Sequence, residues 1–227
     1  MGGPARRRVI IGNRAGVRWN SQRPGSRTIV STRQKNLWRS CSHTRGLPVS
    51  ILSGVPEHVT SLPESGEGRN HDLWLLGRIG TESVTVCVEA KADEPFGNDT
   101  VSEYRLSAVR RGKQGTPTRV PERIDALLAI VGGTLSQWAD VRYQLLTGIC
   151  GTVLQAKADQ SGCGVFVVHE FHTGQTIAEN LVRNHGDYKV FLGVLGIPAD
   201  AVSPGSLFGP VRMGGIDFFV GKAVRQA

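Results

Sequence analysis

The stretch HDLWLLGRIGTESVTVCVEAKA, residues 71–92, decides the fold of this chain. Two extended runs rich in Val, Leu and Trp flank the short polar segment IGTES, so the sequence predicts a β-hairpin. The second run carries an acid and a base two positions apart, Glu89 and Lys91, in a strand that otherwise has a buried character. Removing such ions from water is costly unless they pair or bind something. The two residues are therefore either an ion pair or part of a site.

Successive side chains of a strand point to opposite faces of the sheet, and this decides which of these residues lie on the same face. Glu89 and Lys91 share one face of the second run. The place of Asp72, on the first run, depends on the register of the hairpin. With a turn at residues 80–83, Asp72 lies opposite Lys91, and with a turn two residues longer it lies opposite Glu89. Both registers bring the three side chains together, whereas a one-residue slip separates them.

This combination of charges has a specific chemistry. Two carboxylates on neighbouring strands repel one another unless a cation lies between them, and Mg²⁺ is commonly held by one or two carboxylates together with water and phosphate oxygens. A lysine beside them positions water or neutralises the charge that develops on phosphorus. Asp72, Glu89 and Lys91 therefore suit metal-assisted phosphodiester hydrolysis. The alternative is that Glu89 and Lys91 form a solvated, mutually paired face of an edge strand.

The rest of the chain predicts a mixed α/β domain. Strands are expected at 57–62, 165–171 and 214–224, helices at 122–131, 140–160, 176–184 and 187–196, and a basic loop at 93–120. The large side chains expected in the core are Trp74, Trp138, Phe218 and Phe219. The domain is predicted to span residues 52–227, after a disordered basic leader at 1–51.

The positive charge of the chain lies mainly in that leader. Residues 1–50 hold eleven Lys and Arg and no acid, whereas the remaining residues hold sixteen bases and nineteen acids. The net charge of +8 therefore says nothing about the partners of the folded domain, although a basic arm binds phosphate backbones non-specifically. The leader is interpreted as a disordered tail, an organellar transit peptide or a wrongly extended reading frame. Since the next methionine is Met213, the last explanation requires a non-ATG start.

Several classes of protein are excluded by what the sequence lacks. The four cysteines contain no CxxC pair, which argues against a zinc knuckle or a disulfide framework and indicates an intracellular, cytoplasmic protein. No uncharged apolar run is long enough for a transmembrane helix. No glycine-rich phosphate loop or GxSxG motif is present, so no nucleotide cofactor is expected. His169 and His172 are three positions apart on a strand and face opposite sides, which does not suit a metal pair.

The motif D-x(16)-E-x-K across a hairpin, followed by a long helix and a further strand, resembles the PD-(D/E)XK nuclease superfamily. The segments VPEHVTSLP, HDLWLLGR, VEAKADEPFG and VRYQLL also resemble an uncharacterised bacterial family, a domain of unknown function with a VExKxDEPFG motif that shares this core. The resemblance covers about residues 55–172. It implies a restriction-endonuclease-like αβββαβ core, with a central mixed sheet flanked by helices, and additional C-terminal helices and a strand.

The resemblance also implies roles for individual residues. Asp72 and Glu89 would bind Mg²⁺ or Mn²⁺ together with the carbonyl of Ala90, and Lys91 would be catalytic. The substrate would be DNA or RNA, and the function that of a nuclease.

Four further residues are predicted to contact the substrate. Arg110 and Arg111 belong to the basic loop, and Tyr143 and Gln144 open the long helix. One feature departs from the superfamily, which often has an acidic residue on its first helix: residues 1–56 contain no acid. The alternative is therefore a catalytically inactive binding or regulatory module with the same fold.

Overall fold

The computed structural model describes residues 49–64, 66–198 and 204–226. Its strands are β1 (Val49–Thr60), β2 (Arg69–Ile79), β3 (Glu82–Lys91), β4 (Cys163–His172), β5 (Leu207–Met213) and β6 (Ile216–Gln226). Its helices are α1 (Val101–Lys113), α2 (Val120–Val131), α3 (Leu135–Trp138), α4 (Tyr143–Ala158) and α5 (Ala178–Val194). The predicted leader at 1–51 lies outside the described residues, except for its last three positions, which open β1.

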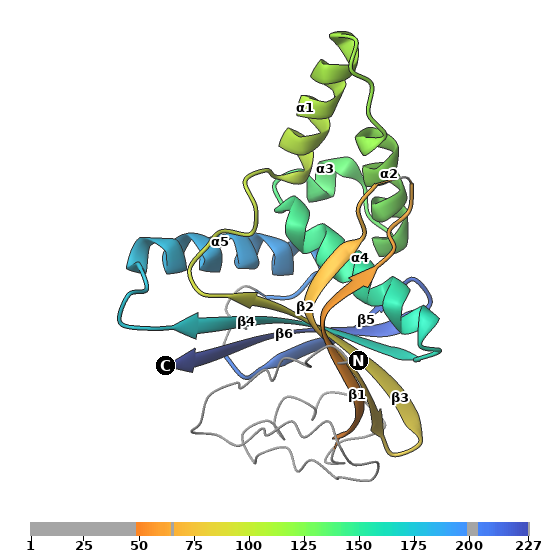
Figure 1. The fold of residues 1–227 in the computed structure, drawn as a ribbon, viewed down its shortest axis with the longest axis vertical. Helices are drawn as coiled ribbons and strands as arrows, with labels where there is room; N and C mark the ends of the chain where they lie inside the picture. The colour runs from red at the N-terminus through yellow and green to blue at the C-terminus, as the bar shows by residue number, and fades with distance from the viewer. Residues whose placement is uncertain (1–48, 65, 199–203, 227) are drawn as a thin grey trace, which may run out of the picture.

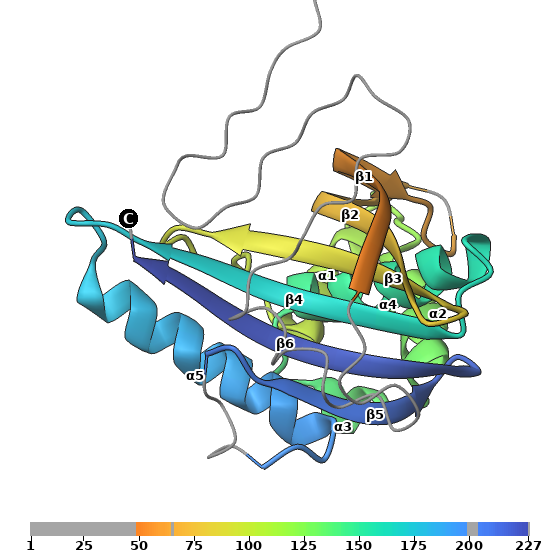
Figure 2. The ribbon, with the colours of Figure 1, turned by 90° about the horizontal axis from the view of Figure 1, so that it is seen from below.

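The six strands form one mixed sheet in the order β1-β2-β3-β4-β6-β5. The contacts β3/β4 and β4/β6 are parallel and the other three are antiparallel. Parallel neighbours require a crossover connection, which α1 to α4 provide between β3 and β4. In Figure 1 the helices lie above the sheet, and Figure 2, from below, shows the strands in front of them. The prediction of a mixed α/β domain with a mixed sheet flanked by helices is confirmed.

The predicted hairpin is confirmed, with a tighter turn than expected. Ile79 pairs with Glu82, so that only residues 80 and 81 form the turn. Gly80 has a φ of 62°, in the left-handed region. Two-residue hairpin loops require a positive φ, and glycine adopts it at low cost.

The register of the hairpin is the second of the two that the sequence allowed, although the ladder continues to Ile79 and Glu82 and the turn is therefore shorter than the one predicted with that register. The ladder between β2 and β3 ends with Leu73 opposite Val88. One further step along each strand places Asp72 across from Glu89. The register that would have placed Asp72 opposite Lys91 is therefore wrong.

The segment 93–120, predicted as a loop, contains helix α1. A capping box begins this helix, because the Thr100 hydroxyl accepts from the amide of Glu103 and the Glu103 carboxylate accepts from the amide of Thr100. Only Val101 and Ala108 of the helix are buried, so its sequence shows no broad apolar stripe. Helices α1 to α3 form a helical lobe, residues 101–138, which stands away from the sheet in Figure 1.

The C-terminal part differs from the prediction in two elements. The two helices expected at 176–184 and 187–196 are one continuous helix, α5. Strand β5 was not predicted because it contains Gly209 and Pro210, which normally interrupt strands. β5 tolerates them because it is an edge strand with an irregular register between Phe208 and Val211. Helices α2 and α4 and strands β4 and β6 are confirmed, with shifts of up to three residues at their ends.

Helix α4 packs closely on the sheet because two of its residues are glycines. A Cβ atom at Gly148 would lie 2.7 Å from the ring of Phe166, and one at Gly151 would lie 2.9 Å from Arg69 Cγ and from His71 Nε2. Such distances leave no room for a side chain. The close approach brings the start of α4 over the ends of β2 and β3.

Most of the predicted core is confirmed. Trp138, Phe218 and Phe219 are buried, whereas Trp74 is half-buried and its indole N–H donates to Asp159 at 2.9 Å. Among the described residues, no helix combines the length and the apolar character that crossing a membrane requires.

Candidate functional site

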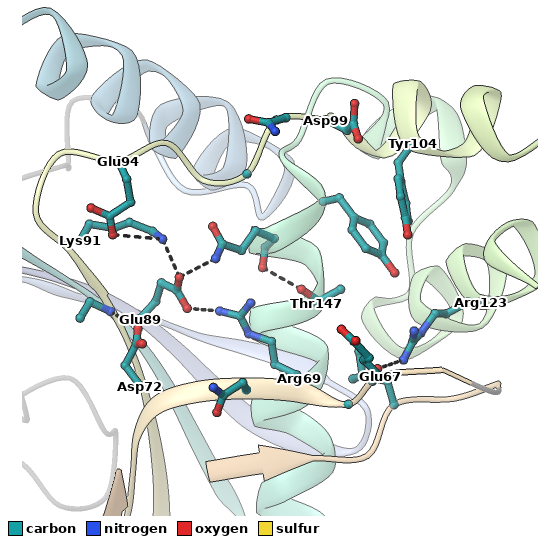
Figure 3. A pocket seen from close by; sticks show the side chains of 18 residues that line it. Glu67, Arg69, Asp72, Glu89, Lys91, Glu94, Asp99, Tyr104, Arg123 and Thr147 are labelled. Atoms are coloured by element: carbon teal, nitrogen blue, oxygen red, sulfur yellow. Dashed lines mark hydrogen bonds and ion pairs between the residues drawn. The ribbon is translucent and has the colours of Figure 1, made fainter. Parts of the chain in front are cut away.

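The sheet opens between β2 and β3 at one end. β2 pairs with β1 as far as Arg69, but its pairing with β3 stops at Leu73. β3 continues beside β4 as far as Lys91. A pocket of about 620 Å³ lies at this opening, with walls from β2, β3, the loop after β3, helices α1 and α2 and the first turns of α4 (Figure 3).

Glu89 lies at the centre of the polar contacts in this pocket and is 3% exposed. Its Oε1 accepts from Lys91 Nζ at 2.8 Å and from Gln144 Nε2 at 2.7 Å. Its Oε2 accepts from Arg69 Nη2. Two cations and one amide therefore neutralise and orient the carboxylate (Figure 3).

Asp72 approaches Glu89 from the other strand. Asp72 Oδ2 accepts from the backbone amide of Ala90 at 2.6 Å, beyond the last ladder pair of β2 and β3. The carboxylate thus takes the place of a backbone acceptor where the strands separate. Because the N–H and C=O of one strand residue point to the same side, the carbonyl of Ala90 faces the same opening. The predicted oxygen donors Asp72, Glu89 and Ala90 are all among the residues that line the pocket.

Lys91 is buried beside the two acids. It is 5% exposed, and its Nζ lies 3.6 Å from Glu94 and 5.7 Å from the centre of the Phe96 ring. Burial lowers the pKa of Lys91 below its ordinary value, and the negative charges of Glu94 and Asp72 partly oppose this shift. The predicted triad of Asp72, Glu89 and Lys91 therefore meets in one pocket.

Comparison with known proteins adds a family to this geometry. The family model described as "Domain of unknown function (DUF6946)" matches residues 31–227. The chain belongs to the DUF6946 family. The match begins within the segment predicted as a leader, and it carries no information on the nuclease superfamily. No curated protein and no solved structure matches the chain.

The four predicted substrate residues of this DUF6946 domain fall in two places. Tyr143 and Gln144 line the pocket, and the ring of Tyr143 lies 4.5 Å from that of Tyr104, between centroids. Burial raises the pKa of Tyr143 to about 12. Arg110 and Arg111 are exposed in the last turn of α1 and do not line the pocket. The structure therefore brings only Tyr143 and Gln144 to the triad.

Sequence reasoning missed Arg69, which contacts Glu89. Arg69 and His71 pack against Gly151 of α4, and Trp74 donates to Asp159 at the end of the same helix. In a regular strand His71 and Trp74 would face opposite sides. β2 therefore rotates about its axis between these two residues, which turns Arg69 towards the pocket. Alternation alone could not have found it.

The helical lobe adds two residues that were also missed. Tyr104 of α1 and Arg123 of α2 line the pocket, and Arg123 Nη2 donates to the carbonyl of Glu67. The segment of α1 was predicted to contact the substrate, but as a loop and through Arg110 and Arg111, so the pocket residues Tyr104 and Arg123 were not identified.

The donor atoms of the pocket fit a hard cation with few protein ligands. Within the described part of the chain, no three His, Cys, Asp or Glu residues form a metal-binding group. Mg²⁺ needs only one or two carboxylates, with water and substrate oxygens completing its shell, and Asp72 and Glu89 with the carbonyl of Ala90 supply such a set. The carboxylates that line the pocket outnumber its cationic side chains by five to three, so it attracts cations.

Proposed function

We propose that this DUF6946 domain is a metal-dependent nuclease that hydrolyses phosphodiester bonds in DNA or RNA. The observation that carries the proposal is the convergence of Asp72, Glu89 and Lys91 in one pocket, at the point where β2 leaves β3. Acids and a lysine in this arrangement supply the charges that phosphoryl transfer requires.

The order of the elements supports a restriction-endonuclease-like core. Strands β1 to β3 form an antiparallel meander, and α4 precedes β4, which lies parallel to β3. This order is the one expected for the βββαβ part of an αβββαβ core, and it supports the proposal. The described residues begin with β1, so they do not test the first helix of that core. The lobe of α1 to α3 and the elements α5, β5 and β6 would then be additions.

In the proposed mechanism Asp72, Glu89 and the carbonyl of Ala90 would hold Mg²⁺ or Mn²⁺, which would polarise the phosphate and lower the pKa of a water molecule. Gln144 keeps the Glu89 carboxylate oriented through its hydrogen bond of 2.7 Å. The Lys91 ammonium, 2.8 Å from Glu89, stabilises the negative charge that develops on the phosphate oxygens.

Metal binding and cleavage test this proposal separately. We expect Mn²⁺ to bind the wild type, and Asp72→Asn to lose that binding because one carboxylate charge is removed. We expect Lys91→Met to retain Mn²⁺ binding but to cleave single-stranded and plasmid DNA about a hundredfold more slowly. Asp140→Ala, which removes an exposed acid outside the pocket, serves as the control. Equal cleavage by the wild type and Lys91→Met would refute the catalytic role.

A second candidate function is a catalytically silent binding module. The observation that favours it is the neutralisation of Glu89 by Arg69 and Lys91, which leaves the acid already paired. In that case the wild type binds no Mn²⁺ in calorimetric titration, and Asp72→Asn changes nothing.

A further inference from the structure

Arg69 contacts the Glu89 carboxylate, which the proposed metal site also uses. The three donors on Glu89 are divided between its oxygens: Lys91 and Gln144 contact Oε1, and Arg69 contacts Oε2. Building on the proposed nuclease function, we propose that Arg69 is the phosphate-binding residue of this site: metal binding displaces it from Glu89, and its guanidinium then holds the phosphodiester.

The guanidinium of Arg69 is poorly satisfied where it stands. Its side chain is only 10% exposed, it contacts Glu89 through Nη2, and its Nε is buried without a hydrogen-bond partner among the described residues. A guanidinium carries five N–H donors in a planar fork that matches the oxygens of a phosphate two at a time. A single contact with one carboxylate oxygen leaves most of that capacity unused.

The stem of Arg69 is fixed while its head group faces the pocket. Arg69 is the first residue of β2, in the part of the strand that pairs with β1 but not with β3. Its Cβ and Cγ lie against Gly151 of α4. The head group lies in the pocket beside Glu89 (Figure 3). We therefore expect the aliphatic part to stay in place when the ion pair breaks and the guanidinium to remain within the pocket.

The other cations of the pocket are placed differently. Lys91 has a second carboxylate, Glu94, at 3.6 Å, and Arg123 donates to the carbonyl of Glu67. Arg69 is held by one carboxylate that the proposed metal also requires. A guanidinium and a divalent cation on the same carboxylate oxygen repel each other, so the contact of Arg69 with Glu89 lowers the apparent affinity for metal.

The first test is Mn²⁺ binding without any nucleic acid, measured by electron paramagnetic resonance of the free ion. We expect Arg69→Gln to bind Mn²⁺ about tenfold more tightly than the wild type, because the competing cation has been removed. Arg78→Gln, an exposed arginine of the same strand, is the matched control and should behave as the wild type. Circular dichroism and thermal melting verify that each variant is folded.

The second test is binding of a fluorescein-labelled single-stranded oligonucleotide, followed by anisotropy with Ca²⁺ in place of the catalytic ion. We expect Arg69→Gln to bind this probe about tenfold more weakly, because the phosphate loses a charge-assisted contact. A purely structural role for Arg69 would weaken both ligands. Tighter metal binding together with weaker phosphate binding is the signature of the proposed exchange.

The possible results separate this inference from the proposed function. If Mn²⁺ binds the wild type, is lost in Asp72→Asn and is no tighter in Arg69→Gln, the role of Arg69 is overturned and the metal site stands. If neither the wild type nor Arg69→Gln binds Mn²⁺, the metal site itself is overturned. If Arg69→Gln does not fold, Arg69→Lys decides: loss of the planar fork should weaken oligonucleotide binding, and unchanged binding of both ligands overturns the inference.

Discussion

The Glu89 carboxylate is held from three elements at once. Arg69 belongs to β2, Lys91 to β3 and Gln144 to α4, and each donates to one of its oxygens. With both oxygens engaged and the side chain 3% exposed, the direction of the carboxylate is set before any ligand arrives. Such preorganisation is costly for folding, since it places charges in a nearly dry environment.

His71, beside Arg69, gives a stability prediction of its own. It is fully buried, and neither ring nitrogen has a hydrogen-bond partner among the described residues. Burial, followed by the charges of Arg69 and His58, lowers the pKa of His71 from 6.5 to about 3. Between those values the unfolded chain binds a proton that the folded protein does not, so stability falls as the pH falls. We expect a loss of about 2 kcal/mol between pH 7 and pH 5, measured by urea unfolding.

Replacing the ring identifies its contribution. His71→Leu removes the titrating group without breaking a hydrogen bond that the structure contains, so its stability should change much less between pH 7 and pH 5. His185→Gln, an exposed histidine of α5, should retain most of the slope of the wild type. Parallel slopes for the wild type and His71→Leu would contradict the assignment.

Among the strands and helices, those with a strong apolar period were predictable and those that depend on tertiary contacts were not. The hairpin β2–β3, helix α4 and strand β4 follow from alternating or helical patterns in the sequence. Helix α1 is stabilised by its capping box and by packing against α2, where Arg105 pairs with Asp125, and no pattern in the sequence showed this contact. Strand β5 forms because β6 offers an edge.

The residues of the candidate site also fall into a group that the sequence pattern predicts and a group that depends on tertiary contacts. Asp72, Glu89 and Lys91 were predictable because the parity of a hairpin brings them together in either register. Arg69 was not, because β2 rotates between His71 and Trp74, and that rotation depends on the neighbouring strand β1 and on α4. Local spacing carries information about regular strands only.

The glycines of α4 give a prediction about packing. A Cβ atom at Gly151 would meet Arg69 and His71 at 2.9 Å. We therefore expect Gly151→Ala to destabilise the protein by about 1–3 kcal/mol, because the helix must move away from the sheet. Chemical denaturation measures this difference.

The matched control lies in α5. A Cβ atom at Gly186 would have no neighbour within 4 Å. Gly186→Ala should stabilise the protein by about 0.5–1 kcal/mol, because alanine restricts the unfolded chain and favours a helix. If both alanine variants change stability in the same direction, the close approach of α4 is not what Gly151 provides.

Over the complete chain, the distribution of charge separates two parts. The eleven bases of residues 1–50 face no acid in that segment, while acids outnumber bases by three in residues 51–227. We therefore expect any non-specific affinity for a phosphate backbone to come mainly from the first part.

Salt dependence checks this division. Replacing Arg6, Arg7 and Arg8 with glutamine should reduce the slope of log affinity for duplex DNA against log salt by about 2–3, the value for three neutralised phosphates. Fluorescence anisotropy at several KCl concentrations gives the slope. The same charge change at three scattered exposed positions of the folded domain, Arg78, Lys157 and Lys189, should change the slope by less than about 1. Equal effects of the two triple variants would contradict the division.

The separation of β2 from β3 beyond Leu73 has a mechanical consequence. Asp72 belongs to a two-stranded arm formed by β1 and β2, whereas Glu89 belongs to the sheet that continues through β4 and β6. No ladder of backbone bonds sets the distance between the two acids; the bond from Ala90 to Asp72 and the packing of α4 do so. A ligand that binds both acids would therefore link the arm to the rest of the sheet. Conversely, a tilt of the arm would change the distance between the acids and the width of the pocket.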